Sequence, residues 1–87
     1  MDRIRALIDE GRVEEAVGLL EQMKADRPDD DVVCYELGNA YWKMQNRKLC
    51  LDNYTEAIRL NPQNPAVEMK KMVMNILQFY NKEMYNV

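Results

Sequence analysis

The sequence predicts an all-α fold of about five helices that fold back on one another as hairpins. Apolar residues recur along the chain at the three- and four-residue spacing of amphipathic helices. Only three glycines and three prolines are present, as in an all-helical chain. The stretch 34–62 holds two apolar runs on either side of a polar turn at 45–46, which predicts two helices packed side by side. A weaker copy of this hairpin precedes it, and half a copy follows it.

The first thirty residues predict a short helix followed by a longer one. Residues 2–10 place their apolar side chains at helical spacing, and Gly11 supplies the left-handed residue that ends this helix. Residues 12–25 carry one apolar stripe with most of the charged side chains outside it, which is typical of an amphipathic helix. Pro28 closes the second helix, because the residue before a proline avoids the α region.

Three further helices are predicted over residues 31–44, 47–60 and 65–82. The aspartates at 29–31 are candidates for the N-cap of the first of these, where their negative charge suits the helix N-terminus. Asn64, followed by a proline, is the expected start of the last helix, because asparagine caps well and proline fits the first helical position.

The chain aligns with itself at an offset of 34 residues, which puts Leu20 on Tyr54 and Pro28 on Pro62. Helix–turn–helix repeats of this length follow a pattern that residues 31–64 match at Leu37, Gly38, Tyr41 and Pro62. Cys50 and Tyr54 replace the alanine and the phenylalanine of the pattern, and Cys34 stands at its tryptophan site. The chain thus resembles the tetratricopeptide repeat family. Its segment NILQFYNKEMYN is similar to the tails of small stand-alone bacterial members.

The resemblance implies a right-handed superhelix, an α–α solenoid, formed by a single domain over residues 1–87. A truncated first repeat would cover 1–30, a full repeat 31–64 and a C-terminal capping helix 65–87. About three repeats are usually needed for a stable solenoid, so two repeats and a cap suggest low stability or help from self-association or a partner.

In this family the first helix of each repeat lines a concave face that binds a protein or peptide partner. By matching position, this face would hold Arg5, Ile8 and Asp9, then Tyr35, Asn39, Trp42 and Lys43, and finally Met69, Lys70, Val73, Ile76 and Leu77. The predicted partner-binding residues are Tyr35, Asn39, Trp42, Lys43, Met69, Lys70, Val73 and Ile76. Aromatic side chains are enriched among interface anchors, which favours contacts from Trp42 and Tyr35. Packing on the neighbouring helix is the alternative for both.

Some members of this family hold a partner's C-terminal carboxylate in a clamp of Lys, Asn and Arg. Asn39 matches the clamp asparagine, but Tyr35 stands where the clamp lysine should be, and Met1 and Arg5 do not restore the pattern. The resemblance therefore does not imply such a clamp. The apolar centre of the face favours an amphipathic helix or an extended apolar segment as ligand.

Missing residue types argue against catalysis, cofactors and metals. The chain has no histidine, no serine and a single threonine, so neither a Ser–His–Asp triad nor a Cys–His pair can be built within it. Two cysteines are too few for a zinc site, and no glycine-rich phosphate motif is present. Cys34 and Cys50 are expected to be buried, inert thiols, and a redox pair is the alternative.

Charge and hydropathy indicate a cytoplasmic protein that binds neither nucleic acid nor membrane. Residues 1–31 carry ten acidic and five basic side chains, and residues 32–87 carry five and seven. No basic face large enough for a phosphate backbone is visible. No apolar run of about 18 residues is present, and the first residues lack the pattern of a secretory signal.

Two functions are compatible with these features. The first is an adaptor that binds a peptide or helix of a partner protein on the concave face. The alternative is a self-associating structural module that dimerises through the last helix, because that helix has more apolar residues than one packing face needs. Its apolar side chains are Met69, Met72, Val73, Met74, Ile76, Leu77, Phe79 and Tyr80. Single exposed hydrophobic residues are common, so some of these side chains are also compatible with an ordinary surface.

Overall fold

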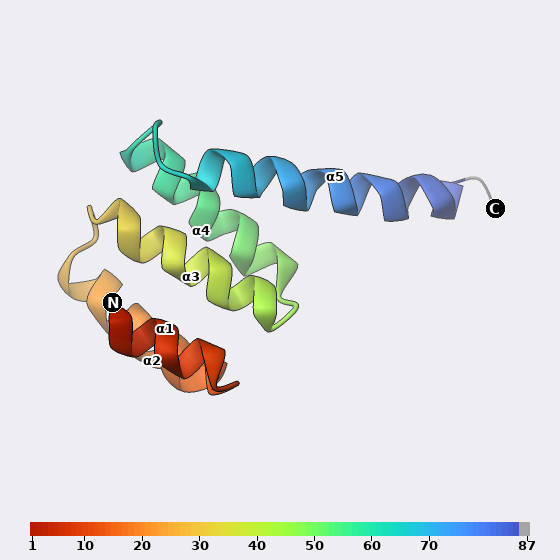
Figure 1. Ribbon diagram of the computed structural model, residues 1–87. Coiled ribbons are helices and arrows are strands. Elements are labelled where there is room, and N and C mark those ends of the chain that lie inside the picture. Colours follow the sequence, from red (N-terminus) through yellow and green to blue (C-terminus); the bar gives the residue numbers. More distant parts are fainter. Residues whose placement is uncertain (86–87) are drawn as a thin grey trace.

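The structure, a computed structural model, describes the backbone of residues 1–85 and the side chains as far as Gln78. Within this range the chain forms five α-helices, and the predicted all-α fold is confirmed (Figure 1). The helices are α1 (Asp2–Asp9), α2 (Val13–Asp26), α3 (Asp31–Lys43), α4 (Arg47–Leu60) and α5 (Ala66–Tyr85). In the described part of the chain, no helix is both long enough and apolar enough to cross a membrane.

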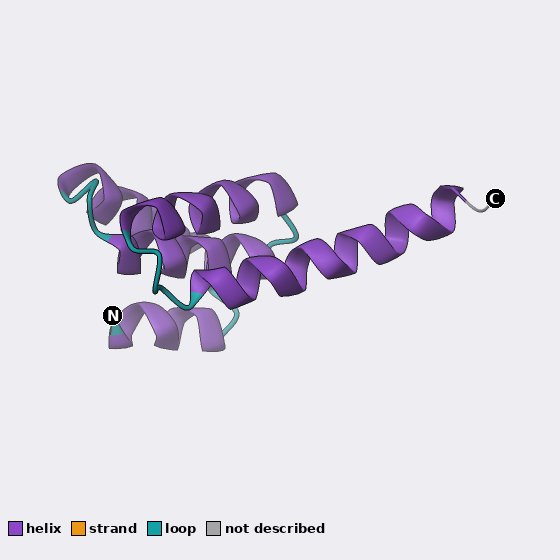
Figure 2. Ribbon diagram, turned by 90° about the horizontal axis from the view of Figure 1, so that it is seen from above, coloured by secondary structure: helices purple, strands orange, loops and turns teal. Residues whose placement is uncertain are grey.

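Successive helices pack against one another as antiparallel neighbours (Figure 1). α1 and α2 form one hairpin, α3 and α4 form the next, and α5 lies along α4 without a following partner in the described residues. Both ribbon views show that α5 extends past the end of the α3–α4 hairpin (Figures 1 and 2). The described molecule is therefore elongated, with extents of 45 × 29 × 17 Å.

The helix ends follow the local signals of the sequence. Gly11 has a φ of 83°, and Gln45 at the equivalent place in the next hairpin has a φ of 62°. Each follows a helix in a Schellman arrangement, in which the two residues after the C-cap donate backbone hydrogen bonds to the last turn. Asp30 and Asn46 cap the N-termini of α3 and α4 with their side-chain oxygens. Asn64 caps α5 as predicted, because its Oδ1 accepts a hydrogen bond from the backbone N–H of Ala66. The helix itself begins at Ala66, one residue later than predicted.

The core lies between the two hairpins and under the first half of α5. Its fully buried side chains include Leu20 of α2, Leu37 of α3 and Val73 of α5. Cys34 and Cys50 are also fully buried and are free thiols. Burial raises the pKa of both thiols, to about 11 for Cys50. A raised pKa keeps the thiols protonated at neutral pH, in agreement with the predicted inert role.

A polar cluster ties the start of α5 to the start of α3. The carboxylate of Asp31 accepts hydrogen bonds from the side-chain amides of Asn64, at 2.6 Å, and Asn61, at 3.2 Å. The first of these bonds is the main cause that holds the pKa of Asp31 below its usual value. Because Asn64 is buried and also caps α5, this cluster fixes where the last helix leaves the α3–α4 hairpin.

Candidate functional site

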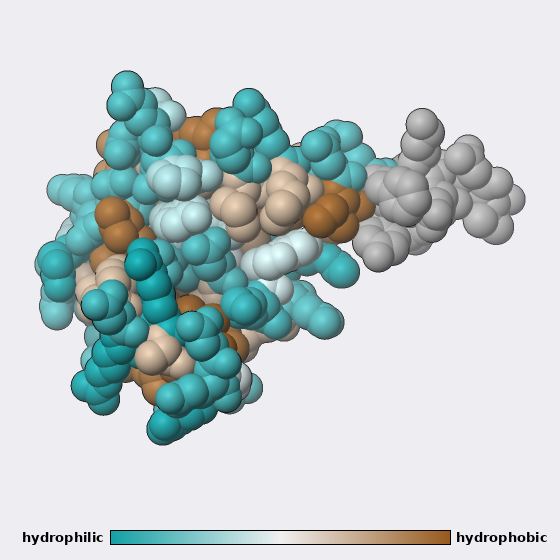
Figure 3. All heavy atoms as spheres, in the orientation of Figure 1, coloured by the Kyte–Doolittle hydropathy of each residue, from teal (hydrophilic) through white to brown (hydrophobic). Residues whose placement is uncertain are grey.

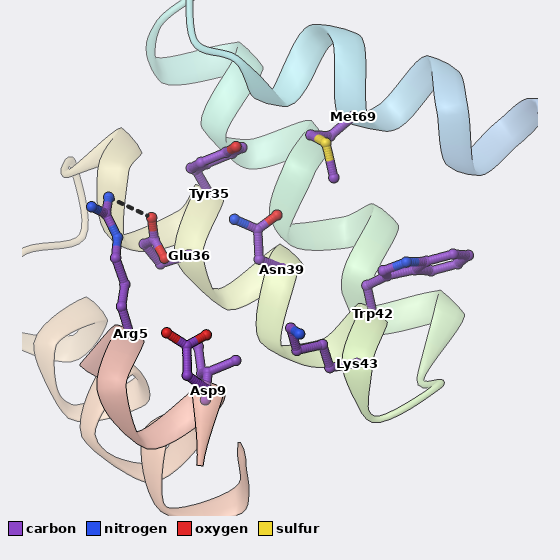
Figure 4. A pocket seen from close by; sticks show the side chains of 9 residues that line it. Arg5, Asp9, Tyr35, Glu36, Asn39, Trp42, Lys43 and Met69 are labelled. Atoms are coloured by element: carbon purple, nitrogen blue, oxygen red, sulfur yellow. Dashed lines mark hydrogen bonds and ion pairs between the residues drawn. The ribbon is translucent and has the colours of Figure 1, made fainter. Parts of the chain in front are cut away.

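The first helices of the two hairpins and α5 line an open cavity of about 430 Å³ (Figure 4). α1 contributes three of its lining residues, α3 contributes five and α5 one. The lining side chains are Arg5, Ile8, Asp9, Tyr35, Glu36, Asn39, Trp42, Lys43 and Met69. Five of the eight predicted partner-binding residues are therefore brought to one place, together with the three α1 residues placed on the same face.

α3 supplies most of the cavity wall because of the spacing of its side chains. Tyr35, Asn39, Trp42 and Lys43 lie four, three and one residues apart, so they share one side of the helix. The opposite side of α3 is buried against α2 and α4. Tyr35 and Trp42 are half-buried, so each keeps part of its ring accessible in the cavity.

Tyr54 supports this wall from behind. Its side chain is fully buried, and its hydroxyl donates a short hydrogen bond of 2.5 Å to Oδ1 of Asn39. Burial raises the pKa of Tyr54 far above its ordinary value, so the hydroxyl keeps the proton that it donates. Because Oδ1 of Asn39 is engaged, its amide nitrogen is the group left to donate to a ligand. The ring of Tyr35 also lies 6.1 Å from that of Tyr54, centroid to centroid.

A buried carboxylate, which the sequence analysis did not identify, forms part of the same wall. The side chain of Glu36 is only 5% exposed, and its Oε1 accepts a hydrogen bond of 3.1 Å from Nη2 of Arg5 (Figure 4). Arg5 is 58% exposed, so it covers the carboxylate from the rim of the cavity. This hydrogen bond is the main cause that raises the pKa of Arg5. The sequence signal for this pair was a glutamate at a buried position of α3. Its partner, Arg5, lies on another helix, so the pairing could not be predicted from the local sequence.

Two further charges flank the cavity without an ion-pair partner among the described side chains. Asp9 is the last residue of α1, whose last turn carries no basic side chain. Lys43 is the last residue of α3. Figure 4 shows both side chains at the end of the cavity opposite Tyr35. The cavity thus combines aromatic and methionine surface with one negative and one positive group that are open to a ligand.

The remaining three predicted residues lie elsewhere. Val73 is fully buried in the core, because α5 turns this side chain towards α4, and it offers no surface to a ligand. Lys70 lines a different cavity between α4 and α5. Ile76 lines a third cavity, of about 580 Å³, together with Trp42, Lys43, Gln45 and Arg47.

The outward side of α5 keeps several apolar side chains accessible. Met72 is 41% exposed and Met74 is 38% exposed. Met74 also lines the cavity between α4 and α5, together with Ile58, Val67, Lys70, Lys71 and Asn75. Hydrophobic surface reaches along α5 as far as the grey atoms in Figure 3. Phe79 and Tyr80, also predicted for this surface, lie outside the described side chains.

Comparisons with known proteins agree with this geometry. A family model described as tetratricopeptide repeat matches residues 32–64. The solution NMR structure of the Bacteroides fragilis protein BF1650 is similar to this chain with 45% sequence identity and a TM-score of 0.85. The alignment covers 98% of this chain and 87% of that protein. No curated protein matches the chain.

Proposed function

Because the chain belongs to the tetratricopeptide repeat family, we propose that its concave face binds a peptide or helix of a partner protein. Tetratricopeptide repeats generally mediate protein–protein interactions, and they are typically interaction modules rather than enzymes. We refer to the cavity lined by α1, α3 and α5 as the concave groove, and it is the proposed site.

One observation carries the proposal. The side chains predicted from the repeat pattern of α3, namely Tyr35, Asn39, Trp42 and Lys43, line the concave groove together with Met69 of α5. Trp, Tyr and Met are enriched in interfaces, and a half-buried aromatic ring loses little conformational entropy when a partner covers it. The site proposed for partner binding omits Val73, Lys70 and Ile76, because none of them lines this groove.

The groove chemistry supports a ligand with apolar and polar groups in alternation. Trp42, Tyr35 and Met69 offer apolar contact, and the amide nitrogen of Asn39 is oriented to donate to a carbonyl oxygen. An amphipathic helix or an extended segment provides such a combination. A purely apolar small molecule would leave Asn39 and Lys43 without partners, which costs binding free energy.

The test uses a random-peptide display library selected on the wild-type protein. The strongest peptide is then measured against Trp42→Ala and against Met72→Ala, an exposed residue outside the concave groove. Trp42→Ala should weaken binding by at least about tenfold, as expected of a central anchor, and Met72→Ala should bind as the wild type does. Equal binding by wild type and Trp42→Ala would sink the proposal. Circular dichroism checks that both variants unfold cooperatively.

A second candidate function is self-association through α5, and the exposure of Met72 and Met74 favours it. Two copies that cover these side chains would remove apolar surface from water. Light scattering over a micromolar concentration series should then give twice the 10.3 kDa chain mass, and Met72→Lys with Met74→Lys should restore the single-chain mass. Val32→Lys, at another exposed apolar residue, is the matched control and should remain dimeric. A single-chain mass for the wild type at every concentration contradicts this candidate.

A further inference from the structure

We propose that the concave groove selects partner segments by an acidic side chain, which binds beyond Trp42 between Lys43 and Arg47. This inference rests on the proposed function, because it assumes that a segment of a partner occupies the groove. It adds the chemical class of that segment: apolar residues over Tyr35, Trp42 and Met69, followed by an aspartate or glutamate. The residues concerned differ from those of the C-terminal carboxylate clamp considered above.

The concave groove continues past Trp42 into a second cavity. Trp42 and Lys43 line both the cavity of about 430 Å³ and the cavity of about 580 Å³. From α5, Met69 lines the first cavity and Ile76, about two helical turns further on, lines the second. A segment that packs on Trp42 along α5 therefore passes from the first cavity into the second.

Hydrogen-bond donors dominate the second cavity. Lys43 and Arg47 carry positive charges, and the indole N–H of Trp42 is a donor only. Among the described side chains, the lining of this cavity contains no carboxylate. Gln45 adds an amide that can also donate, and Ile76 supplies apolar surface that reduces access of water. An anionic group is the ligand that matches such a set, because charge-assisted hydrogen bonds to arginine and lysine are the strongest of this kind.

Six basic side chains in the described part of the chain have carboxylate partners, and Lys43 and Arg47 are among those that have none. Arg12 pairs with Glu15, Lys48 pairs with Asp52, and Arg59 pairs with Glu56, each on one helix or at its start. Neither Lys43 nor Arg47 forms an ion pair within the part of the chain whose side chains are described. A partner's carboxylate would therefore meet two cations whose charge is not already neutralised.

The α1 side of the groove has the opposite character, which restricts how the ligand can lie. Arg5 is engaged by the buried carboxylate of Glu36, and Asp9 adds a negative charge that has no ion-pair partner among the described side chains. An acidic side chain is therefore disfavoured near α1 and favoured near Arg47. The segment is expected to lie with its acidic residue under Ile76 and with neutral or basic residues on the α1 side, near Asp9.

The experiment uses the strongest peptide from the display library, synthesised with an amidated C-terminus and a fluorescein label. Its affinity is measured by fluorescence polarisation for wild type, Arg47→Gln and Lys43→Gln. Lys48→Gln is the matched control, because Lys48 follows Arg47 directly but pairs with Asp52 outside the cavity. A second peptide carries the amide, Asn or Gln, in place of its acidic residue.

We expect the selected peptides to share an acidic residue at a fixed distance from an aromatic or apolar anchor. Arg47→Gln should weaken binding of the acidic peptide by about tenfold, as expected for the loss of a hydrogen-bonded charge pair. Lys43→Gln should also weaken binding of this peptide. Lys48→Gln should leave the affinity unchanged. The amide peptide should bind wild type and Arg47→Gln equally, because the group that Arg47 contacts is gone.

Two results overturn this inference while the proposed function stands. One is a peptide that depends on Trp42 but binds Arg47→Gln as tightly as Lys48→Gln. The other is a set of Trp42-dependent peptides without an acidic residue. If no selected peptide depends on Trp42, both the proposed function and this inference are overturned.

Discussion

Gly38 of α3 packs directly against the ring of Tyr54 of α4, with no space for a side chain between them. A Cβ atom at position 38 would overlap Cδ1 and Cε1 of the ring and lie 3.1 Å from its Cγ. The same tyrosine holds Asn39 in the wall of the concave groove through its hydroxyl. Close packing of the α3–α4 hairpin and the geometry of the proposed site therefore depend on one contact.

The substitution Gly38→Ala should destabilise the protein by about 1–3 kcal/mol, because the buried ring of Tyr54 must shift. The gain in helix propensity, up to about 1 kcal/mol, offsets only part of this cost. Gly18→Ala is the matched control: Gly18 is exposed in α2 with no atom near the added methyl group. It should stabilise the protein by about 0.5–1 kcal/mol. Urea unfolding measures both changes in unfolding free energy. A Gly38→Ala variant as stable as the wild type would contradict the close packing.

The substitution Tyr54→Phe keeps the buried ring but removes the hydroxyl that binds Asn39. The expected loss of unfolding free energy is about 1 kcal/mol, with weaker peptide binding because the amide of Asn39 is no longer oriented. Tyr41→Phe is the control, since the Tyr41 hydroxyl has only a long contact of 3.4 Å with Glu21 outside the groove. It should leave peptide affinity unchanged. Equal affinities for wild type and Tyr54→Phe would show that this orientation does not matter.

The substitution Gln45→Gly should stabilise the protein by about 1 kcal/mol. Gln45 has a φ of 62°, which is a left-handed backbone conformation. This conformation costs about 1 kcal/mol for a residue with a side chain and almost nothing for glycine. Gly11→Ala makes the reverse change at the equivalent position, where φ is 83°, and should destabilise by a similar amount. Thermal and urea unfolding measure the pair. Two changes of the same sign would contradict the equivalence of the two helix ends.

Acid should remove the stabilisation provided by Asp31. Its pKa is lowered in the folded protein, chiefly by the hydrogen bond from Asn64, so the folded state favours the ionised form. The contribution is therefore fully present above the ordinary value of 3.8 and is lost as the pH falls through the lower folded value. The stability difference between wild type and Asp31→Asn should be constant near neutral pH and shrink in that acidic range. Asp29→Asn, at an exposed aspartate, is the control.

Cys34 and Cys50 should resist thiol reagents in the folded protein. Both side chains are fully buried, and burial raises the pKa of Cys50 to about 11. Reaction with a chromogenic disulfide should be slow in buffer and fast in denaturant. Thr55→Cys places a thiol at an exposed position of α4. This thiol should react in buffer at the rate of a free, accessible thiol. Fast labelling of the wild-type protein in buffer would contradict the inert role.

Local patterns were sufficient for the helices, and the resemblance to the repeat family predicted one wall of the groove. The predicted ranges 31–44 and 47–60 agree with α3 and α4 to within one residue, because capping and periodicity are encoded by neighbouring residues. The last helix was predicted to end near residue 82, and α5 continues to Tyr85. The side chains of Tyr35, Asn39, Trp42 and Lys43 line the concave groove because they belong to a single helix whose opposite face is buried.

The sequence by itself determined which segments are helical and where they begin and end, and its resemblance to the repeat family indicated which side of α3 is left open. Only the tertiary structure decided how α5 is rotated against α4, which buries Val73 and turns Lys70 to another cavity. It also decided that Glu36 meets Arg5 across 31 residues of sequence. Helix formation follows from residues three or four apart, whereas these contacts depend on how separate helices pack. No local pattern specifies that packing, because it is selected by the shape of the whole core.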